Sequence, residues 1–403
     1  MKEVTIAMVA LGGYGNFYLG HIFNALPESG IKLVAGIDPN PVGCSFLHEF
    51  EARSIPIYPD LETCYQHGWA DLVIIAAPIH LHTPFTITAL EHGSSVLCEK
   101  PVAATIQETR AMLRAEAANP GFVGIGYQWS YAPAMQALKQ DIIAGVLGRP
   151  VQFKTKILWP RTSTYYGRNT WAARIKSASG AWVLDSPANN ATAHYLHNCF
   201  YVLGKSRESS ALLVDVQAEL YRANRIENYD TAAIRCRTDE GVEVLFYTAH
   251  PVPDNIGPVL SYEFEEALVS FDPSDNQLRA DFHNGQVKDY GNPSENDAHK
   301  LWQAVQAVRT GKPMACGVQA ASTHTLCINS AQESVTAITN FPNDLVQVSG
   351  NANDTLTWVT GLQETLEACY DNGLLPAEMQ PAVPWAQAGR IVDVRAYREY
   401  PSR

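Results

Sequence analysis

The first hundred residues of the chain alternate between short apolar runs and segments with helical periodicity. The apolar runs are short enough to be strands buried on both faces of a sheet. They are VTIAMVAL (4–11), KLVAGID (32–38), ADLVIIAAP (70–78) and SSVLCEK (94–100). The segments between them carry apolar residues at helical spacing. This alternation predicts a parallel sheet with helices on both of its faces.

A glycine-rich turn lies between the first predicted strand and the helix that follows it. It reads Ala10-Leu11-Gly12-Gly13-Tyr14-Gly15, which matches the dinucleotide-binding pattern G-x-G-x-x-G except for alanine at the first position. Alanine there predicts a negative φ at residue 10. Taken alone, the motif also fits an ordinary tight turn. Its place between a strand and a helix favours phosphate binding by Gly12, Gly13, Tyr14 and Gly15.

Asp38 ends the second predicted strand, where a carboxylate would hold the ribose hydroxyls of a dinucleotide. The negative charge would repel a 2′-phosphate, and no lysine or arginine follows directly in DPNPVG. The sequence therefore predicts NAD rather than NADP as the cofactor. The alternative is that Asp38 only caps the turn in DPNP.

Two further segments make the comparison with known proteins specific. APIHLHTPFTITALEHG (77–93) and VLCEKPVAAT (96–105), together with the glycine turn, resemble the Gfo/Idh/MocA family of NAD(P)-dependent oxidoreductases. The family pattern is close to T-P-N-x-x-H followed by E-K-P. Pro78, His82 and Glu99-Lys100-Pro101 match, whereas Ala77 and Ile79 depart. Segments 124–153 and 311–335 resemble the family more loosely, and the last residues, from LVQVSGN onward, cannot be matched.

The resemblance implies a Rossmann domain followed by an α+β domain with a large, open, mainly antiparallel sheet. We expect a dinucleotide-binding domain at 1–125, a substrate and oligomerisation domain at 126–344, and a C-terminal extension at 345–403 packed on both. Alternating segments such as 232–250 agree with strands in the second domain. An open sheet face has to be covered, and in this family a second subunit covers it. A homodimer or homotetramer is therefore expected.

The resemblance also implies roles for residues of the first domain. The lysine of E-K-P lies beside the nicotinamide and the substrate hydroxyl in the family, so Lys100 is the first catalytic candidate. It would donate to an alkoxide or act as a base; the alternative is a surface lysine after a strand. Glu99 is expected near the nicotinamide ribose or orienting Lys100. The other residues expected at the cofactor are Ala77, Pro78, His82 and Gln128, and Tyr127 is expected at the substrate or in the core.

The segment WVLDSPANNATAHYLHN (182–198) corresponds to the family pattern D-x-G-x-H-x-x-D. Asp185 keeps the acid, Asn189 stands where the family has its histidine, and Thr192 replaces the second acid. Asparagine cannot act as a base, but it can exchange hydrogen bonds with a sugar hydroxyl. His194 is a candidate for a displaced catalytic histidine, against an ordinary helix-face histidine. We expect no metal, because the His194–His197 pair has no evident third ligand.

Ser186 and Pro187 predict an N-cap and the first position of an α-helix. Just before this segment, 157–171 holds aromatic and basic residues that suit a sugar. Trp159, Arg161 and Tyr165 are the substrate candidates, with plain packing as the alternative. His250, at the end of a predicted strand, is a weaker one.

Composition limits the partners. The chain has 403 residues with 29 Lys and Arg against 41 Asp and Glu, a net charge of −12, which disfavours nucleic acid. No apolar run reaches the length of a membrane span. With no CxxC pair and no export signal, the eight cysteines predict reduced thiols in the cytoplasm.

Three functions remain open from the sequence. The first is NAD-dependent oxidoreduction of a secondary alcohol in a sugar, sugar derivative or cyclic polyol. The second is a glycoside hydrolase, lyase or epimerase that keeps NAD bound and oxidises its substrate transiently. The third is a non-catalytic NAD-binding sensor, against which the intact Glu99-Lys100 and Asp185 count.

Overall fold

The computed structural model describes residues 2–25 and 29–402, which form two compact units. The first unit consists of the chain up to residue 103 together with 107–132 and 296–322. The second consists of 104–106, 133–295 and the chain from 323 onward. The units interleave along the chain. The boundaries expected at residues 125 and 344 remain a prediction about sequence organisation.

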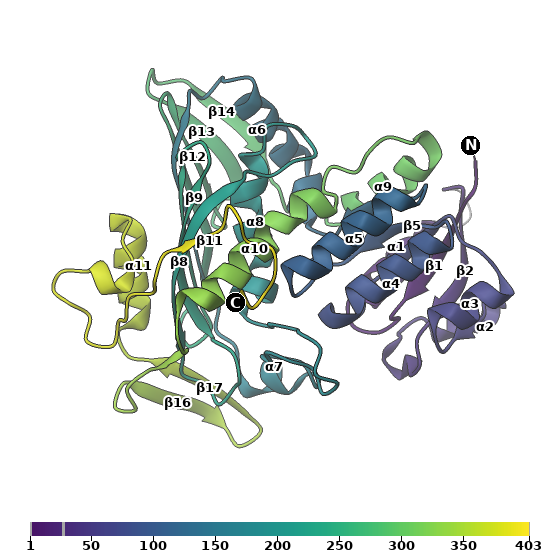
Figure 1. Cartoon of the computed structure of the whole chain (residues 1–403), viewed down its shortest axis with the longest axis horizontal. Coiled ribbons are helices and arrows are strands. Elements are labelled where there is room, and N and C mark those ends of the chain that lie inside the picture. Colours follow the sequence, from purple (N-terminus) through teal and green to yellow (C-terminus); the bar gives the residue numbers. More distant parts are fainter. Residues whose placement is uncertain (1, 26–28, 403) are drawn as a thin grey trace. The chain divides into compact units, whose positions relative to one another are not determined.

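A six-stranded, wholly parallel sheet forms the centre of the first unit, as Figure 1 shows. Its strands in spatial order are β3 (Ile57–Tyr58), β2 (Ile31–Ile37), β1 (Val4–Val9), β4 (Leu72–Ile75), β5 (Ser95–Cys98) and β6 (Val123–Ile125). Every residue of β4 is buried, which explains why its sequence is a continuous apolar run rather than an alternating one. The predicted Rossmann sheet is confirmed.

Helices surround this sheet. They are α1 (Gly15–Ala25), α2 (Leu47–Ala52), α3 (Leu61–His67), α4 (Ile79–Glu91), α5 (Ile106–Ala118) and α9 (His299–Thr310), with short turns η1 (Pro41–Gly43) and η2 (Gln128–Tyr131). The helix α9 comes from late in the chain and packs against β1, β4 and β5. It therefore brings distant sequence to the carboxyl ends of the strands that carry the predicted cofactor site.

The second unit is built on a ten-stranded sheet that is mainly antiparallel. Its strands in spatial order are β14 (Val287–Gly291), β13 (Gln277–Phe282), β12 (Ala267–Asp272), β11 (Ile256–Phe264), β7 (Pro150–Leu158), β10 (Glu243–Ala249), β9 (Thr231–Thr238), β8 (Leu213–Arg222) and β15 (Thr339–Asn340), with β18 (Val392–Asp393) also on β8. Only the pairs β7–β10 and β8–β15 are parallel. The predicted mixed but mainly antiparallel sheet is confirmed.

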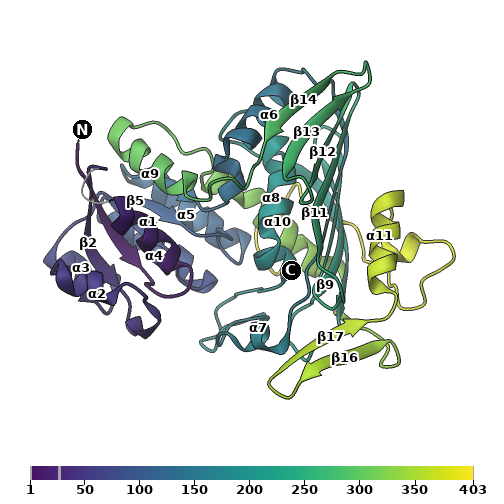
Figure 2. The same ribbon diagram turned by 180° about the vertical axis from the view of Figure 1, so that it is seen from behind.

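Helices lie on both faces of this sheet. One group consists of α6 (Pro133–Ile143), α8 (Ala193–Val202) and α10 (Val318–Ser334), the last of which begins in the first unit. On the other face lies α11 (Leu362–Asn372), which Figure 2 shows from behind, followed by η4 (Pro376–Glu378). Leu362, Leu366 and Trp385 share one buried apolar cluster with Leu245 and Tyr247 of β10.

This packing changes one expectation. Part of the open sheet face that we assigned to a second subunit is covered by the chain's own residues after 360. The physical reason is the apolar stripe of α11, which needs burial and finds it on β7 and β10. A homo-oligomer stays a prediction, but an uncovered sheet face is no longer a full argument for it.

A separate two-stranded hairpin follows β15. Its strands are β16 (Val346–Asn351) and β17 (Asp354–Val359). The hairpin lies beside the short helix α7 (Ser163–Gly167) in both Figure 1 and Figure 2. It belongs to the part of the sequence that matched no family motif.

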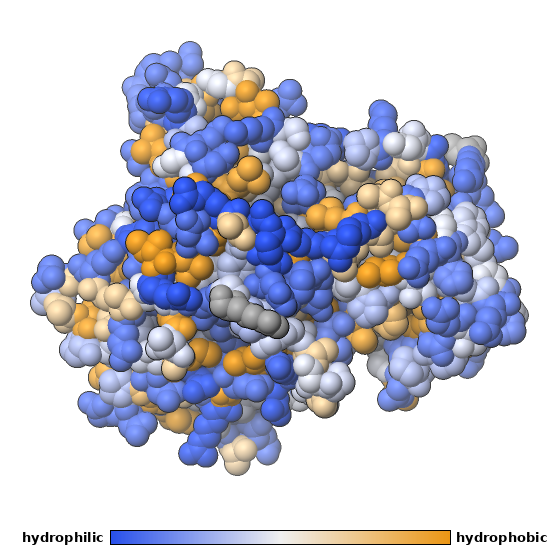
Figure 3. All heavy atoms as spheres, in the orientation of Figure 1, coloured by the Kyte–Doolittle hydropathy of each residue, from blue (hydrophilic) through white to orange (hydrophobic). Residues whose placement is uncertain are grey.

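The helices, the surface and the cysteines add three observations. In the part of the chain that the structure describes, no helix is long and apolar enough to cross a membrane. On the face shown in Figure 3, apolar side chains form small groups among polar ones. All eight cysteines are described, buried and outside any disulfide, so they pack as small hydrophobic residues.

Candidate functional site

The glycine turn joins β1 to α1, as predicted, but its first residue corrects the sequence analysis. Ala10 has φ +65°, in the left-handed region, where a negative φ was expected. The Ala10 N–H donates to the Ile37 carbonyl at 2.9 Å, which fixes the residue to the end of β2. The Ala10 carbonyl then turns back toward Gly15. Neighbouring hydrogen bonds therefore hold an alanine where glycine is the usual choice.

The turn fits the pyrophosphate of a dinucleotide. A Cβ atom at Gly13, which has φ +54°, would meet nothing within 4 Å, so this part of the backbone faces open space. Gly15 is the first residue of α1, an eleven-residue helix whose dipole favours an anion at this end. The first three N–H groups of the helix donate to carbonyls of the glycine turn. The chain thus offers the backbone cradle that a phosphate group needs.

Gly15 cannot accept a side chain, which gives a first prediction. A Cβ there would lie 2.1 Å from the Ala10 carbonyl oxygen. We expect Gly15→Ala to lower stability by about 1–3 kcal/mol, because strand and helix must separate, and to weaken NAD binding. Urea unfolding and calorimetric titration measure the two effects. Gly68→Ala is the matched control, since a Cβ at Gly68 meets nothing within 4 Å; equal effects in both variants would contradict the assignment.

Asp38 lies directly after β2 and touches the same turn. One carboxylate oxygen accepts the Leu11 N–H at 2.9 Å and the other accepts the Asn40 N–H at 2.8 Å. The carboxylate therefore does cap the turn, which was the alternative from sequence. Each oxygen has a second lone pair, so the same group can also accept from a ribose hydroxyl. The ribose contact remains a prediction.

His82 is almost fully buried in α4 and connects two loops. Its Nδ1 lies 2.7 Å from the Pro101 carbonyl oxygen and its Nε2 lies 2.8 Å from the Ala77 carbonyl oxygen. Burial lowers the pKa of His82, although both carbonyl groups oppose that shift. A neutral imidazole donates to only one of the two at a time. His82 therefore ties the segment of Ala77 and Pro78 to the Glu99-Lys100-Pro101 loop, and its contact with a cofactor stays a prediction.

Glu99 is the centre of a buried polar cluster at the carboxyl end of β5. Its Oε1 accepts from the Tyr18 hydroxyl at 2.6 Å and from the Lys300 ammonium at 2.5 Å. Its Oε2 accepts the Lys100 N–H at 3.2 Å. Lys300 also donates to the Tyr14 hydroxyl at 3.0 Å. One cluster thus joins the glycine turn, α1, α9 and the backbone of Lys100.

The charges in this cluster are balanced. Burial raises the pKa of the Glu99 carboxyl, but the charge of Lys300 and the hydrogen bonds from Lys300 and Tyr18 outweigh it, so the pKa is lowered. Burial, and next to it the Glu99 charge, raises the pKa of Tyr18 well above its usual value. The carboxylate is therefore ionised at neutral pH and the phenol stays protonated.

Lys300 was missed by the sequence analysis, although the sequence holds a signal. In α9, Lys300 shares one helical stripe with Ala304 and Ala307, and all three are buried. A lysine on the apolar stripe of an amphipathic helix has to find a buried carboxylate. That signal predicts a partner but not which one.

Gln128 and Tyr127 follow β6 in the same unit. The Gln128 side-chain amide donates to Asp297 at 2.9 Å, which fixes it to the loop before α9. Tyr127 is 1% exposed, and burial raises its pKa well above the usual value. Tyr127 therefore packs in the interior of the unit, as one of our two alternatives held.

In the second unit, the segment of Asp185 differs from the expected α-helix. Ser186 does cap it, accepting the Asn189 N–H at 3.3 Å, but Pro187–Ala191 forms a π-helical turn (η3) and α8 begins at Ala193. The cause is Thr192, whose N–H donates to the Pro187 carbonyl five residues earlier at 2.9 Å. The α-helix expected directly after Ser186 therefore begins only at Ala193.

The side chains of Asp185 and Asn189 hydrogen-bond to the backbone of two residues that have positive φ. Ala173 has φ +53° and Leu184 has φ +51°. The Asp185 carboxylate accepts the Ala173 N–H at 2.5 Å, and the Asn189 amide donates to the Leu184 carbonyl at 3.0 Å. Strained residues of this kind cluster at functional sites.

Further contacts define how these two side chains are used. Asp185 also accepts from the Asn190 amide at 2.7 Å and lies 3.6 Å from Arg168. The amide oxygen of Asn189 is buried and has no hydrogen-bond partner among the described residues. His194 lies one turn later, in the first turn of α8, and is half-buried. Asn189 therefore keeps one acceptor for another group.

The predicted aromatic and basic residues lie near one another and near His250. The Arg161 and Arg168 guanidinium carbons lie 5.1 Å and 3.8 Å from the Tyr165 ring centre. The Tyr165 and His250 ring centres are 5.6 Å apart. Trp159 instead donates to the Gly257 carbonyl at 3.0 Å. Tyr165 and Arg161 thus belong to one polar cluster, with Trp159 at its edge.

His250 has a larger part in this cluster than the sequence indicated. Its Nδ1 lies 2.9 Å from the Trp159 carbonyl oxygen, so Nδ1 carries the hydrogen. Its buried Nε2 has no partner among the residues that the structure describes. Burial, and next to it the charge of Arg161, lowers the pKa of His250 to about 3. His250 is therefore neutral, with a lone pair that can accept from a hydroxyl.

The lowered pKa gives a second prediction. In the unfolded chain the histidine has a pKa of about 6.5 and is protonated below that pH. In the folded protein, His250 stays neutral until the pH falls to about 3. Stability therefore falls as the pH drops through this window, by about 1.4 kcal/mol per pH unit for this one proton. We expect His250→Asn to reduce that slope between pH 6 and 4. Urea unfolding at several pH values measures it, with exposed His48→Asn as control; an unchanged slope would contradict a neutral His250.

No metal site is apparent in residues 2–25 and 29–402, where no group of three or more His, Cys, Asp or Glu is arranged to hold an ion.

The comparison with protein families concerns the first unit. Residues 4–127 match the family model GFO_IDH_MocA, described as "Oxidoreductase family, NAD-binding Rossmann fold". The first unit therefore contains the NAD-binding Rossmann domain that this family model describes.

Curated relatives resemble this chain over less than half of its length. The inositol 2-dehydrogenase of Rubrobacter xylanophilus is 25% identical over 154 residues, which cover 38% of the chain and 43% of the relative. The 2,7-anhydro-N-acetylneuraminate hydratase of Mediterraneibacter gnavus is 32% identical over 149 residues, covering 37% and 38%. These matches span less than half the length of either relative.

The fold of the whole chain also has known counterparts. The WlbA dehydrogenase from Bordetella pertussis, solved with NADH and UDP-GlcNAcA, aligns with a TM-score of 0.68 and 21% identity. The alignment covers 83% of this chain and 98% of that one. At this identity the likeness shows only that the two chains share a fold. It does not transfer a substrate.

Proposed function

We propose that the chain is an NAD-dependent oxidoreductase that moves a hydride between nicotinamide and a secondary alcohol of a sugar, sugar derivative or cyclic polyol. The observation that carries this proposal is the Glu99 cluster. It fixes the backbone of Lys100 at the carboxyl end of β5, the same sheet edge on which the glycine turn lies. Ligands of open parallel sheets bind at that edge.

The chemistry is divided between cofactor and protein. Bound NAD would supply the hydride acceptor. Lys100 would handle the proton, by donating a hydrogen bond to the alkoxide or by accepting its proton. Asp185, Asn189 and His194 would contact substrate hydroxyls. Among these, the unpartnered amide oxygen of Asn189 supports such a role.

NAD is preferred over NADP in this proposal. The Asp38 carboxylate is held at the end of β2 by the N–H groups of Leu11 and Asn40. A fixed negative charge at this place repels a 2′-phosphate and accepts from the ribose hydroxyls. The measurement is the ratio of NAD to NADP affinity, which we expect to fall in Asp38→Ala.

The substrate class is supported by the names of relatives. One relative is an inositol 2-dehydrogenase, and a protein of the same fold was solved with the sugar nucleotide UDP-GlcNAcA. In this chain, Arg161, Tyr165 and His250 form a cluster of aromatic faces, donors and one open acceptor, which suits a polyhydroxylated ring. We also propose a homodimer or homotetramer, which light scattering would test.

The proposal is tested by mixing the protein with NAD and a panel of sugars and inositols, and following the absorbance of reduced nicotinamide. We expect at least one member to give NADH. The proposal fails if NAD binds but no sugar or inositol is oxidised or reduced and, in addition, none of them is converted by the transient oxidation described next.

A second candidate is supported by two observations. One relative is a hydratase of an anhydro sugar, and Asn189 replaces the histidine of the family pattern. Oxidation beside a C–H bond acidifies it, so elimination or epimerisation can follow before the hydride returns. This candidate predicts NAD that co-purifies with the protein and sugar products without net NADH.

A further inference from the structure

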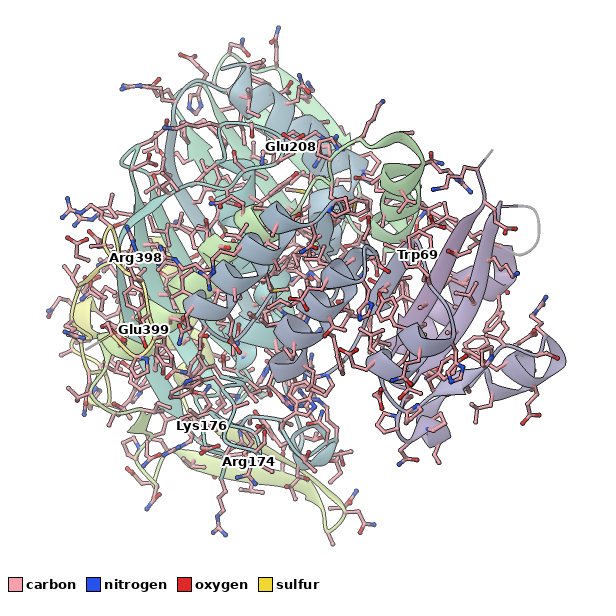
Figure 4. All side chains as sticks on the ribbon, turned by 45° about the vertical axis from the view of Figure 1, so that its right-hand side comes forward. Trp69, Arg174, Lys176, Glu208, Arg398 and Glu399 are labelled. Carbon is pink, nitrogen blue, oxygen red and sulfur yellow. The ribbon has the colours of Figure 1, made fainter. Side chains whose placement is uncertain are left out.

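The second unit contains a groove outside the cluster of Arg161, Tyr165 and His250. Its volume is about 910 Å³, and its walls are α7, the loop after β8 and the β16–β17 hairpin. The lining includes Tyr166, Asn224, Arg225, Val348, Thr355 and Thr357. A smaller pocket of about 440 Å³ shares Tyr166 and Arg225 with it. Arg174, labelled in Figure 4, lines that smaller pocket.

Hydrogen bonds fix the hairpin wall of this groove to α7. Asp354 accepts the Thr164 N–H at 3.0 Å, and the Thr355 N–H donates to the Ser163 hydroxyl at 3.0 Å. A β-bridge joins Thr162 to Leu356. The hairpin is therefore held beside the helix that carries Tyr165 and Tyr166.

The opposite wall is also held in place. The Arg222 guanidinium donates to Asn340 at 3.1 Å and to the Glu227 carbonyl at 2.7 Å. The buried Asp230 carboxylate accepts from the Asn224 N–H at 2.8 Å and from its side-chain amide at 2.9 Å. Both walls are thus preformed, as ligand sites usually are.

The lining suits a sugar. Thr355 and Thr357 alternate along β17 and present hydroxyls to the groove, and Asn224 and Arg225 add amide and guanidinium groups. Val348 is 66% exposed on β16, beside Thr357, and offers an apolar contact. A sugar ring has hydroxyl groups at its edge and C–H groups on its faces. The polar groups of the groove can hydrogen-bond to the former, and its apolar surface can contact the latter.

Tyr166 connects the groove to the proposed reaction site. It lines both the groove and the smaller pocket, and its ring centre lies 6.4 Å from that of His250. Its hydroxyl oxygen is buried without a partner among the described residues. The smaller pocket also includes Ala173, whose N–H binds Asp185. A ligand in the groove would therefore lie one side chain away from the Asp185 and His250 region.

We propose that the groove between α7 and the β16–β17 hairpin is a second sugar subsite, so that the substrate is a disaccharide or longer glycoside. This inference rests on the proposed function, because it takes the reacting ring to lie beside His250 and Asp185. The volume is near the upper end of the roughly 300–1,000 Å³ of ligand sites. The groove therefore has room for a linked ring, while the ring that reacts lies outside it.

The test compares monosaccharides with disaccharides that contain them, such as glucose with cellobiose, maltose and gentiobiose. Thr357→Trp fills the groove from β17, where an aromatic residue suits the strand. Gln347→Trp is the matched control, because Gln347 is exposed on β16 and points to the other face of the hairpin. We expect Thr357→Trp to lower kcat/KM for the preferred disaccharide by about tenfold or more, with the monosaccharide unchanged. Gln347→Trp should change neither.

The outcomes separate this inference from the proposed function. Monosaccharide oxidation with no gain from a second ring, or equal losses in both variants, overturns the subsite and leaves the function intact. If no sugar is oxidised, calorimetry with the same disaccharides decides: binding that is lost only in Thr357→Trp supports the subsite, and no binding overturns it. If Thr357→Trp changes only the mass measured by light scattering, the groove is a subunit interface and the inference is wrong.

Discussion

Replacing Lys100 with methionine is expected to lower turnover by about 10²–10⁴-fold while the protein still binds NAD. Methionine keeps most of the side-chain length but can neither donate nor exchange a proton, and a positioned acid or base contributes a factor of this size. The backbone of residue 100 is held by Glu99, so the substitution leaves the loop in place. Steady-state kcat and calorimetric NAD affinity measure the two effects separately.

Lys205→Met is the control for this prediction. Lys205 is 68% exposed and pairs with the surface carboxylates of Asp239 and Glu240, so its loss should leave turnover unchanged. Near-normal turnover in Lys100→Met would mean that another group handles the proton. His250 and His194 would then be the next residues to replace.

Replacing Lys300 with methionine is expected to lower the free energy of unfolding by about 3–5 kcal/mol, since it leaves one partner of a buried ion pair uncompensated. Neither side chain has water to replace the lost partner, because Lys300 is 0% and Glu99 is 8% exposed. Urea unfolding measures the loss. The variant with both Glu99→Gln and Lys300→Met should recover much of it, because no buried charge remains.

The pH dependence of the same variant gives an independent check. With Lys300, the pKa of Glu99 lies below its unfolded value of about 4.3, so its contribution is present above that pH and lost as the pH falls. Without Lys300, burial raises the pKa, and the folded carboxyl binds a proton that the unfolded one has lost. Relative to the wild type, the stability of Lys300→Met should then decrease as the pH rises above about 5. An unchanged pH profile would contradict a buried, uncompensated Glu99.

The sequence predicted the architecture because its strongest patterns are local. Continuous apolar runs identified the strands of the first sheet, and the alternating segment 232–250 contains β9 and β10, as predicted. Local patterns did not predict that α11 packs on one face of the second sheet. The contact of α11 with β10 joins segments that are more than a hundred residues apart. An amphipathic helix predicts that its apolar face is buried, but not which element it packs against.

The candidate site was predicted in its residue types but not in its contacts. The motifs identified Glu99, Lys100 and Asp185, whereas the partner Lys300 is supplied by a helix about two hundred residues later. Ala10 was assigned a negative φ from the general preference of alanine, and hydrogen bonding to β2 overrides that preference. The π-helical turn at Pro187–Ala191 also depends on hydrogen bonds from the Thr192 N–H and hydroxyl to the Pro187 carbonyl, which periodicity does not reveal.

Transfer of hydrogen from a sugar carbon to nicotinamide is the central claim, and an isotope follows it directly. A substrate carrying deuterium on every ring carbon is mixed with the protein and NAD, the reaction is quenched within one turnover, and the nicotinamide is analysed by mass spectrometry. The account predicts deuterium on the nicotinamide ring, in free NADH for net oxidation or in bound cofactor for a transient cycle. Product formed with no deuterium on the nicotinamide would contradict it.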